Sequence, residues 1–270
     1  INGGTNTTVN VTSVAGAGSG QFNISNVGPA VTPQLRFTVD GGGTIAFPHS
    51  FSGNSGIITT IHVDNNGTGT NGVVQLNGDG GAGYGNATLN VTGGNGYSLY
   101  IANLYNFAGA LGTMTFNPTS AALELGNLTV RRNTGTGTFV LGGTNTANRV
   151  SGVISNGTGA SLGGLSAVTK SGTGTWTLSG ANTYTGLTSV TGGKLVVTSL
   201  GDGLAPSALG MSALTPASLV FSAGTTFGYA GAGETSARGF TMGDNLTIEA
   251  AGTGALAFTS TAKVAFSGAS

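Results

Sequence analysis

The residues of this chain that could most readily do chemistry are its eight carboxylates. They are Asp40, Asp64, Asp79, Glu124, Asp202, Glu234, Asp244 and Glu249. A glycosidase needs two carboxylates at a matched separation, so that one can act as acid and the other as base or nucleophile. Here the acids are spread singly over 270 residues. The sequence therefore indicates no catalytic residue and no enzyme, and a polysaccharide-active enzyme is the least favoured alternative.

The two histidines offer a second kind of chemistry. His62 and Asp64 are two residues apart in a strand-like run, so their side chains would share one face of that strand. Such a pair could orient an imidazole or bind a metal, but no third ligand lies near in the sequence. We expect a surface pair on an outward face. His49 follows Pro48, and we expect it in a loop.

The sequence predicts no cofactor, with calcium as the alternative. Asp64, Asp79 and Asp202 lie in turns rich in Gly and Asn, where carboxylates and carbonyl oxygens, the ligands of hard cations, are abundant. The sequence contains no tandem calcium-binding nonapeptides. The stretch from Asp79 to Gly83 resembles only a fragment of one. Capping of turns by Asp and Asn is the favoured interpretation.

A small group of aromatic residues supplies the candidates for contact with a partner. Tyr97, Tyr100, Tyr105 and Phe107 lie within eleven residues. They could form a stacking platform for sugars or for another subunit, or they could pack inside the fold, which we favour. Trp176 is the fifth candidate, and we expect it in the core or as a wedge at the edge of a coil.

Composition excludes several classes of partner. The chain has 8 basic and 8 acidic residues, a net charge of zero, and no basic cluster beyond Arg131 and Arg132. We therefore expect no nucleic acid partner. No apolar run approaches the ~20 residues of a membrane span. The chain has no cysteine and begins at Ile1, and we expect a secreted or surface-exposed chain whose signal peptide has been removed.

Short strand-like runs, separated by Gly, Asn and Asp, follow one another along the chain. They are 9–14, 21–27, 34–39, 57–63, 73–76, 87–91, 97–104, 113–116, 122–131, 137–141, 150–154, 175–178, 195–198, 218–222, 240–242, 246–250, 255–259 and 263–266. No amphipathic helix is indicated, and this pattern suits a β-sandwich, a closed barrel or a β-solenoid. Abundant Thr and Asn, which could stack in ladders, and scarce charge favour the solenoid. Three strands per coil, at ~20–30 residues per coil, would stack at the ~4.8 Å strand spacing.

One segment is more specific than the rest. From Lys170 it reads K-S-G-T-G-T-W-T-L-S-G-A-N-T-Y-T-G, followed by L-T-S-V-T-G-G-K-L-V-V. It predicts strands at Thr175–Leu178, from Thr183 to Thr185, and from Lys194 to Thr198, with turns between them. This segment resembles the autotransporter-associated β-strand repeat, also called the passenger-associated transport repeat, and the resemblance extends over about 135–270. It implies an exported bacterial protein with a right-handed parallel β-helix.

We therefore predict an all-β protein, a right-handed parallel β-helix of short strands with Gly- and Asn-rich turns. Residues 1–270 would form a single solenoid, with motif-poor coils over 1–134 and repeat-like coils over 135–270. The predicted function is an extracellular structural protein that assembles with copies of itself into a fibre or surface layer. The alternative is a passenger or stalk segment of a bacterial surface adhesin. Its partner would then include a polysaccharide of a cell surface or matrix.

Overall fold

The computed structural model describes residues 7–17, 22–24, 32–53, 56–79, 85–106, 112–131, 134–157, 163–259 and 264–267. Its strands form two long parallel sheets and one short sheet. The first long sheet contains β1 (Thr8–Val11), β3 (Gln34–Thr38), β5 (Ile58–Asp64), β7 (Ala87–Gly93), β9 (Thr113–Pro118), β11 (Thr136–Leu141), β14 (Leu165–Lys170), β16 (Thr188–Val190), β18 (Leu219–Phe221), β21 (Thr241–Met242) and β24 (Ala265–Phe266).

The second long sheet contains β2 (Phe22–Ile24), β4 (Gly43–Gly53), β6 (Gly72–Asp79), β8 (Ser98–Asn106), β10 (Ala122–Val130), β12 (Asn148–Val150), β15 (Thr175–Leu178), β17 (Lys194–Val197), β19 (Thr226–Tyr229) and β22 (Thr247–Ala250), with β13 (Ile154–Ser155) beside β10. The short sheet pairs β20 (Ala232–Ser236) with β23 (Gly254–Phe258). The two described 3-10 turns are η1 (Ala15–Ala17) and η2 (Pro216–Ser218). Among the described residues, none of the helical segments has the length and apolar character to cross a lipid bilayer.

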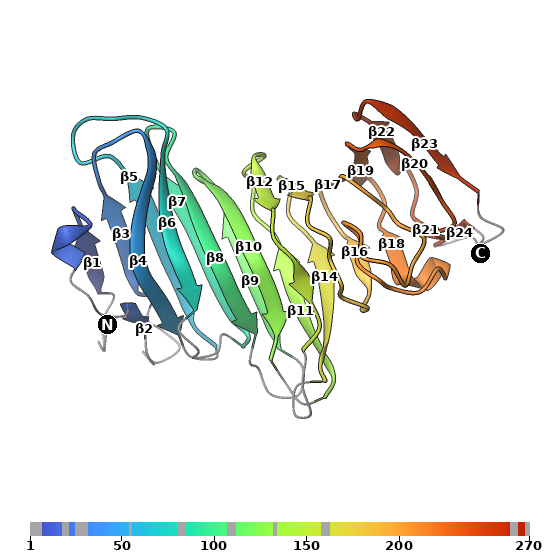
Figure 1. Ribbon diagram of the computed structural model, residues 1–270, viewed down its shortest axis with the longest axis horizontal. Helices are drawn as coiled ribbons and strands as arrows, with labels where there is room; N and C mark the ends of the chain where they lie inside the picture. Colours follow the sequence, from blue (N-terminus) through green and yellow to red (C-terminus); the bar gives the residue numbers. More distant parts are fainter. Residues whose placement is uncertain are drawn as a thin grey trace.

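The chain alternates between the two long sheets and so winds into a β-solenoid, whose coils stack along the long axis of the molecule (Figure 1). Leu35 pairs with Ile61, and Ile61 pairs with Val91, so successive coils advance by 26 and then 30 residues. The prediction of an all-β solenoid is therefore confirmed. The prediction of three strands in every coil is wrong, because a third described face exists only as β13 and the β20–β23 pair.

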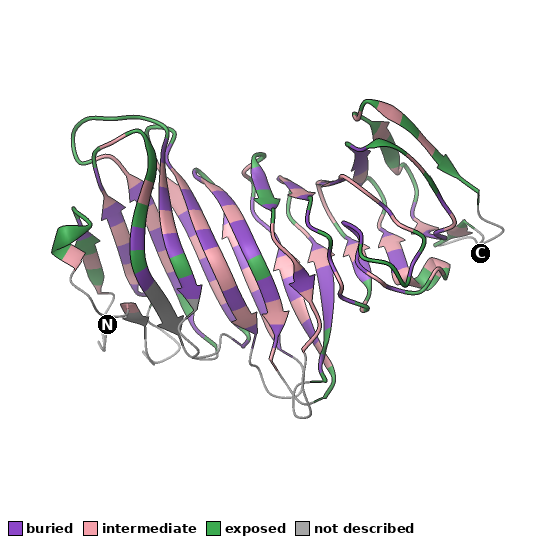
Figure 2. Ribbon diagram, in the orientation of Figure 1, coloured by how far each residue is buried: buried purple, intermediate pink, exposed green. Residues whose placement is uncertain are grey.

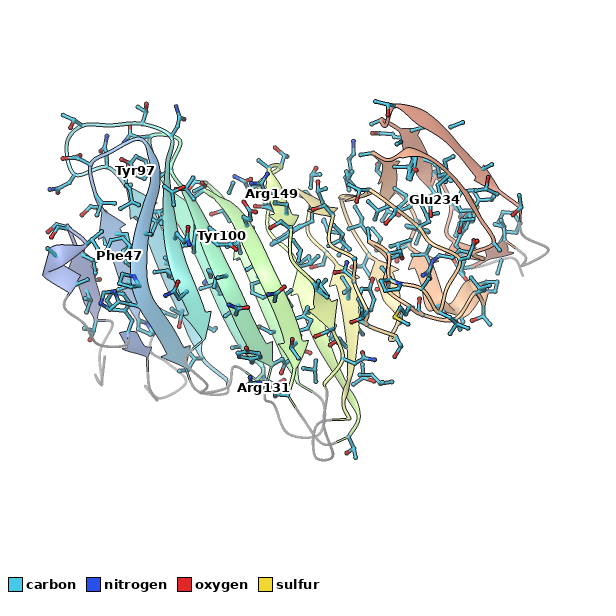
Figure 3. The ribbon with its side chains drawn as sticks, in the orientation of Figure 1. Phe47, Tyr97, Tyr100, Arg131, Arg149 and Glu234 are labelled. Atoms are coloured by element: carbon cyan, nitrogen blue, oxygen red, sulfur yellow. The ribbon has the colours of Figure 1, made fainter. Side chains whose placement is uncertain are left out.

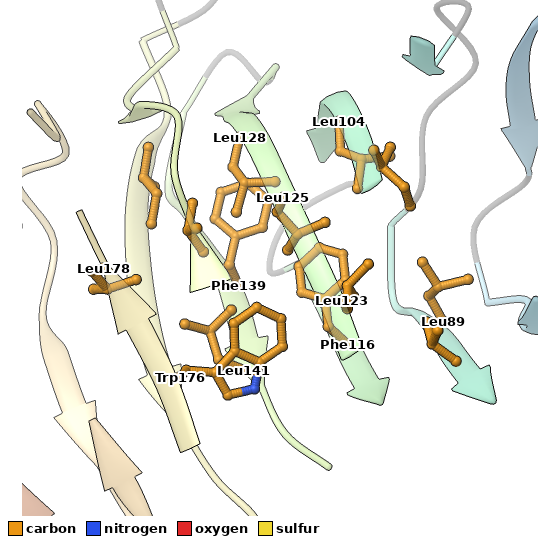
Figure 4. Packing of buried hydrophobic residues seen from close by; sticks show 14 of the residues in the cluster. Leu89, Leu104, Phe116, Leu123, Leu125, Leu128, Phe139, Leu141, Trp176 and Leu178 are labelled. Carbon is orange, nitrogen blue, oxygen red and sulfur yellow. The ribbon is translucent and has the colours of Figure 1, made fainter. Parts of the chain in front are cut away.

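Alternation of side chains along each strand builds the core. In β5 and in β9, buried and partly exposed residues alternate strictly, as expected for strands with one face inside. Each buried side chain lies beneath a counterpart in the next coil: Leu89 pairs with Phe116, and Phe116 with Leu141. These columns fill the space between the sheets (Figure 4), and Figure 2 shows the alternation of buried and partly exposed residues along the strands. Since each column spans many coils, stability accumulates between neighbouring coils.

Polar ladders stack on the outward faces in the same way. Asn117 Nδ2 donates to Asn90 Oδ1 at 2.7 Å, and Asn127 Nδ2 donates to Asn103 Oδ1 at 3.0 Å. Each ladder satisfies amide groups between coils without using charge. The predicted stacking of like polar residues is thus confirmed, and it explains how a chain with so few charged residues covers its surface.

Several expected local features differ in the structure. The expected strand from Thr183 to Thr185 is wrong: Asn182 forms only an isolated bridge to Ser207, and the strand lies at Thr188–Val190. His49 is not in a loop but is buried in β4, close to the ring of Phe22. Pro48 hides β4 in the sequence, and it is accommodated where the pairing with β6 shifts its register.

Candidate functional surfaces

The corners between the two long sheets are held by carboxylates of the preceding coil. Asp40 Oδ1 accepts hydrogen bonds from the backbone N–H groups of Asn66 at 2.9 Å and Thr68 at 2.8 Å. Asp64 Oδ1 accepts from the backbone N–H of Asn65 and from Asn95 Nδ2, both at 2.8 Å. The hydrogen bond from Asn95 is the main cause that lowers the pKa of the Asp64 carboxyl. Both residues tie one coil to the next.

Two of the three calcium candidates, Asp64 and Asp202, have this capping role. Asp64 caps its own turn and the next coil, and Asp202 Oδ1 accepts from the backbone N–H of Ala237 at 2.7 Å. Asp79 ends β6, and its side chain lies outside the described part of the chain. In the described ranges, no three side chains of His, Cys, Asp or Glu come together to hold a metal ion.

His62 and Asp64 lie side by side on the outward face of β5, as predicted. His62 Nε2 is 3.6 Å from Asp64 Oδ2, and His62 Nδ1 is within hydrogen-bonding distance of Thr92 Oγ1, at 3.0 Å. Partial burial lowers the pKa of His62, and the nearby charge of Arg36 lowers it further. The imidazole is therefore neutral at neutral pH and joins the polar ladder of β5 and β7.

Two of the aromatic contact candidates are buried. Tyr97 is 2% exposed, and its hydroxyl lies 2.7 Å from the carbonyl oxygens of both Val39 and Gly41. Trp176 is fully buried, and its indole N–H donates to the carbonyl of Gly142 at 2.8 Å. These two residues hold corners together inside the fold, and neither ring is exposed for contact with a partner. Phe107 lies outside the described residues.

Tyr100 and Tyr105 are the contact candidates that the structure leaves partly exposed, on the outward face of β8. The guanidinium carbon of Arg131 lies 3.6 Å above the centroid of the Tyr105 ring. Tyr100 is in register with Glu124, which pairs with Arg149 of β12 (Figure 3). Tyr105 thus lies under a guanidinium, and Tyr100 lies beside an ion pair.

The other long sheet carries a shallow groove at its N-terminal end. Its lining residues all have polar side chains: Thr8, Asn10, Thr12, Gln34, Arg36, Thr38 and Asn66. They come from β1, the residue after it, β3 and the loop that follows β5. Arg36 was not among the predicted site residues. The alternation of Gln34, Arg36 and Thr38 does place it outward, but only strand pairing reveals what surrounds it.

The repeat-like segment puts its characteristic side chains inside. Lys170 is fully buried in a position that neighbouring coils fill with Leu141 and Val190, and its ammonium group donates to the carbonyls of Ser171, Gly172 and Gly192 at 2.6, 3.0 and 2.9 Å. Burial lowers the pKa of Lys170 from 10.5 to about 8. Sequence reasoning missed this residue, because a lysine between Thr169 and Ser171 looks like an exposed one.

Other signature residues of this segment act in the same way. Asn182 Nδ2 donates to the carbonyl of Ala208, and Asn182 Oδ1 accepts from the backbone N–H of Ile154. The Tyr184 hydroxyl lies 2.6 Å from Thr188 Oγ1, and burial raises the pKa of Tyr184 to about 12. Every one of these groups bonds inside the coil stack. The segment thus holds neighbouring coils together through buried hydrogen bonds, and we call these buried polar side chains staples.

A second buried cluster holds the turns that follow β17. Arg238 is 2% exposed, and it donates to the carbonyls of Leu200 and Gly210, both at 2.7 Å, and to Ser212 Oγ at 2.9 Å. Burial lowers the pKa of Arg238. The Glu234 carboxylate accepts from two successive backbone N–H groups of the same turns, those of Leu200 at 2.8 Å and Gly201 at 2.5 Å. This cluster fixes the loop that follows β17.

The fold and its surfaces together define a class: an elongated β-solenoid with stapled corners and polar outer faces. Comparison with known proteins shows which repeat family this solenoid contains. Residues 168–197 match the passenger-associated-transport-repeat family, so the chain carries a repeat of the autotransporter-associated type, as its residues indicated.

A stretch of 88 residues, 32% of the chain, is 41% identical to the adhesin BmaC autotransporter of Brucella suis biovar 1 (strain 1330). That stretch makes up 2% of the length of the adhesin. No solved structure matches the chain.

Proposed function

We propose that this chain is a passenger segment of an exported bacterial surface adhesin, in which it serves as a stiff, non-catalytic β-solenoid stalk. The observation that carries the proposal is the repeat at 168–197, which matches a passenger-associated family and lies in register within both long sheets. The similarity to an autotransporter adhesin supports the same role. The proposed location of the chain is the cell surface or the extracellular space.

The buried staples of the repeat give this role a physical basis. Lys170, Trp176 and Asn182 each bond to backbone carbonyls of a neighbouring corner or coil. A stalk must resist bending and slippage between coils, and buried polar groups with specific partners fix the register of one coil on the next. The residues that mark the repeat thus contribute rigidity, and binding would be left to outward faces.

Surface labelling tests the proposal. Antibodies raised against the chain would be applied to intact cells of the source bacterium, before and after treatment of those cells with an external protease. We expect labelling of intact cells that protease removes, while a periplasmic control protein is protected. Cells that lack the chain should attach more weakly to surfaces. Labelling that appears only after lysis would contradict the proposal.

A second candidate function, assembly of copies into a fibre or surface layer, is favoured by the last described strands. Ile248 of β22 is 47% exposed and Phe266 of β24 is 69% exposed, although their partners in the preceding coil are more buried. Exposed apolar side chains on such strands can accept another coil. Copies of this chain are one source of such a coil, and sedimentation velocity over a range of concentrations tests whether they associate.

A further inference from the structure

The groove at the N-terminal end of the first long sheet has the chemistry of a binding site. It has a volume of about 510 Å³ and lies over the outward faces of β1 and β3. Its floor consists of side chains in register across the two strands: Thr8 beside Gln34, and Asn10 beside Arg36. The floor is therefore a regular grid of polar groups on a rigid sheet.

The lining is rich in groups that both donate and accept hydrogen bonds. Three threonine hydroxyls and the side-chain amides of Asn10, Gln34 and Asn66 surround a single guanidinium, and no described carboxylate or apolar side chain contributes to the lining. Hydroxyls and amides suit a ligand that is itself covered in hydroxyl groups, because each can adapt as donor or acceptor. The groove therefore favours a sugar over an apolar ligand.

Among the described residues, Arg36 supplies the only charge in this lining. In the described part of the chain it forms no salt bridge. The two acids of the adjoining corner are engaged elsewhere: Asp40 caps Asn66 and Thr68, and Asp64 bonds to Asn65 and Asn95. His62, in register with Arg36, carries no counter-charge. The guanidinium is thus available for an anionic group, which it can bond with two parallel N–H groups.

The wall of the groove is fixed before any ligand arrives. The loop that contains Asn66 is held by two hydrogen bonds to Asp40. The Tyr97 hydroxyl holds the corner beneath it, and a Cβ on Gly69 would lie 2.9 Å from the backbone nitrogen of Gly41. Because the loop and the corner pack this closely, Asn66 is held in place. A preformed wall reduces the entropy lost on binding.

We propose that this groove binds a carboxylated sugar unit, such as a uronic acid, within a polysaccharide chain. The Arg36 guanidinium would bond the carboxylate, and the surrounding Thr, Asn and Gln side chains would bond the ring hydroxyls. The proposal deepens the adhesin role proposed above and rests on it. The groove has one cation, Arg36, among neutral polar side chains. A uronic acid unit likewise has one carboxylate and several hydroxyl groups. Nucleic acid or a densely sulfated chain would need several cations.

The test uses the purified 270-residue chain and isothermal titration calorimetry. The probes are a galacturonic acid oligomer and its methyl ester, which keeps the hydroxyls but removes the negative charge. We expect the acid to bind at least about tenfold more tightly than the ester, since a charge-assisted bond is lost in the ester. Arg36→Gln should abolish this preference, and Arg36→Lys should restore part of it.

The matched control is Arg149→Gln, which removes a guanidinium from the outward face of the other sheet and should leave the preference unchanged. Thermal unfolding of each variant verifies that it is folded. Equal affinity for acid and ester, equal effects of the two Arg→Gln substitutions, or no binding at about 10 mM acid would overturn the proposal. Failure of this test while antibodies still label intact cells would overturn the groove alone, whereas a chain found only inside cells would overturn the adhesin role.

Discussion

The buried lysine of the repeat shows how much a single residue contributes. Lys170 occupies a position in an apolar column, and its ammonium group reaches three corner carbonyls. Its stem packs in the core while its charge satisfies oxygen atoms that would otherwise be buried without partners. A methionine of similar shape would keep the packing and leave those carbonyls without a donor.

This arrangement predicts a dependence of stability on pH. The pKa of Lys170 is about 8 in the folded chain and 10.5 when unfolded, so between these values the unfolded state binds more protons and the free energy of unfolding rises with pH. Tyr184, with a pKa of about 12 when folded and 10.0 when unfolded, has the opposite effect above pH 10. We therefore expect the melting temperature to rise from pH 8 to about pH 10.

Two variants separate the effect of Lys170 from that of other groups. Lys170→Met should lose the rise and, at pH 7, about 1–3 kcal/mol of stability, because three carbonyls lose their donor. Lys170→Arg keeps a charge that does not titrate in this range, so it should also lose the rise. Melting temperatures measured by circular dichroism check both, and a rise of the same size in either variant would show that Lys170 is not its source.

At the scale of the elements, the corners determine which strands can stack. A Cβ on Gly180 would lie far inside van der Waals contact with the carbonyl oxygen of Gly152 in the preceding coil, whereas a Cβ on Gly42 would lie 3.7 Å from its nearest neighbour. Backbone atoms cannot move aside as a flexible side chain can. The spacing between coils at Gly180 therefore depends on the absence of a side chain.

We predict that Gly180→Ala destabilises the chain by about 1–3 kcal/mol, as overpacking of a tight contact does. Gly42→Ala is the matched control and should change the stability little, or raise it by up to about 1 kcal/mol through the lower entropy of the unfolded chain. Urea denaturation followed by fluorescence of Trp176 measures both. Equal midpoints for the two variants would mean that the corner can open without cost.

The elements also show what could be predicted from the sequence. Alternation identified strands such as β5 and β15, because one face of each is buried. Alternation missed β4, because Pro48 and His49 interrupt the pattern. It also did not give the number of strands per coil, because the offset between coils changes from 26 to 30 residues. The groove around Arg36 could not be predicted, because it depends on which strands pair and on where the loop with Asn66 folds.

At the scale of the whole molecule, the apolar columns are buried in most of the described coils and more exposed in the last described strands. Phe227 and Phe221 are each 1% exposed, but Phe258 is 36% and Phe266 is 69% exposed in the last described strands (Figure 2). The ring centroid of Phe258 lies 5.4 Å from that of Phe240, so the aromatic column continues into this end. Its last members have no coil above them among the described residues.

This end predicts reversible self-association, because stacking a second coil would remove apolar side chains from water. Sedimentation velocity between about 1 and 100 µM should show a sedimentation coefficient that rises with concentration. Phe258→Ser combined with Phe266→Ser should abolish the rise. Leu165→Ser, which removes an exposed apolar side chain from the middle of the first long sheet, should not. A monomer at every concentration would contradict assembly through this end, and the stalk would then act without copies of itself.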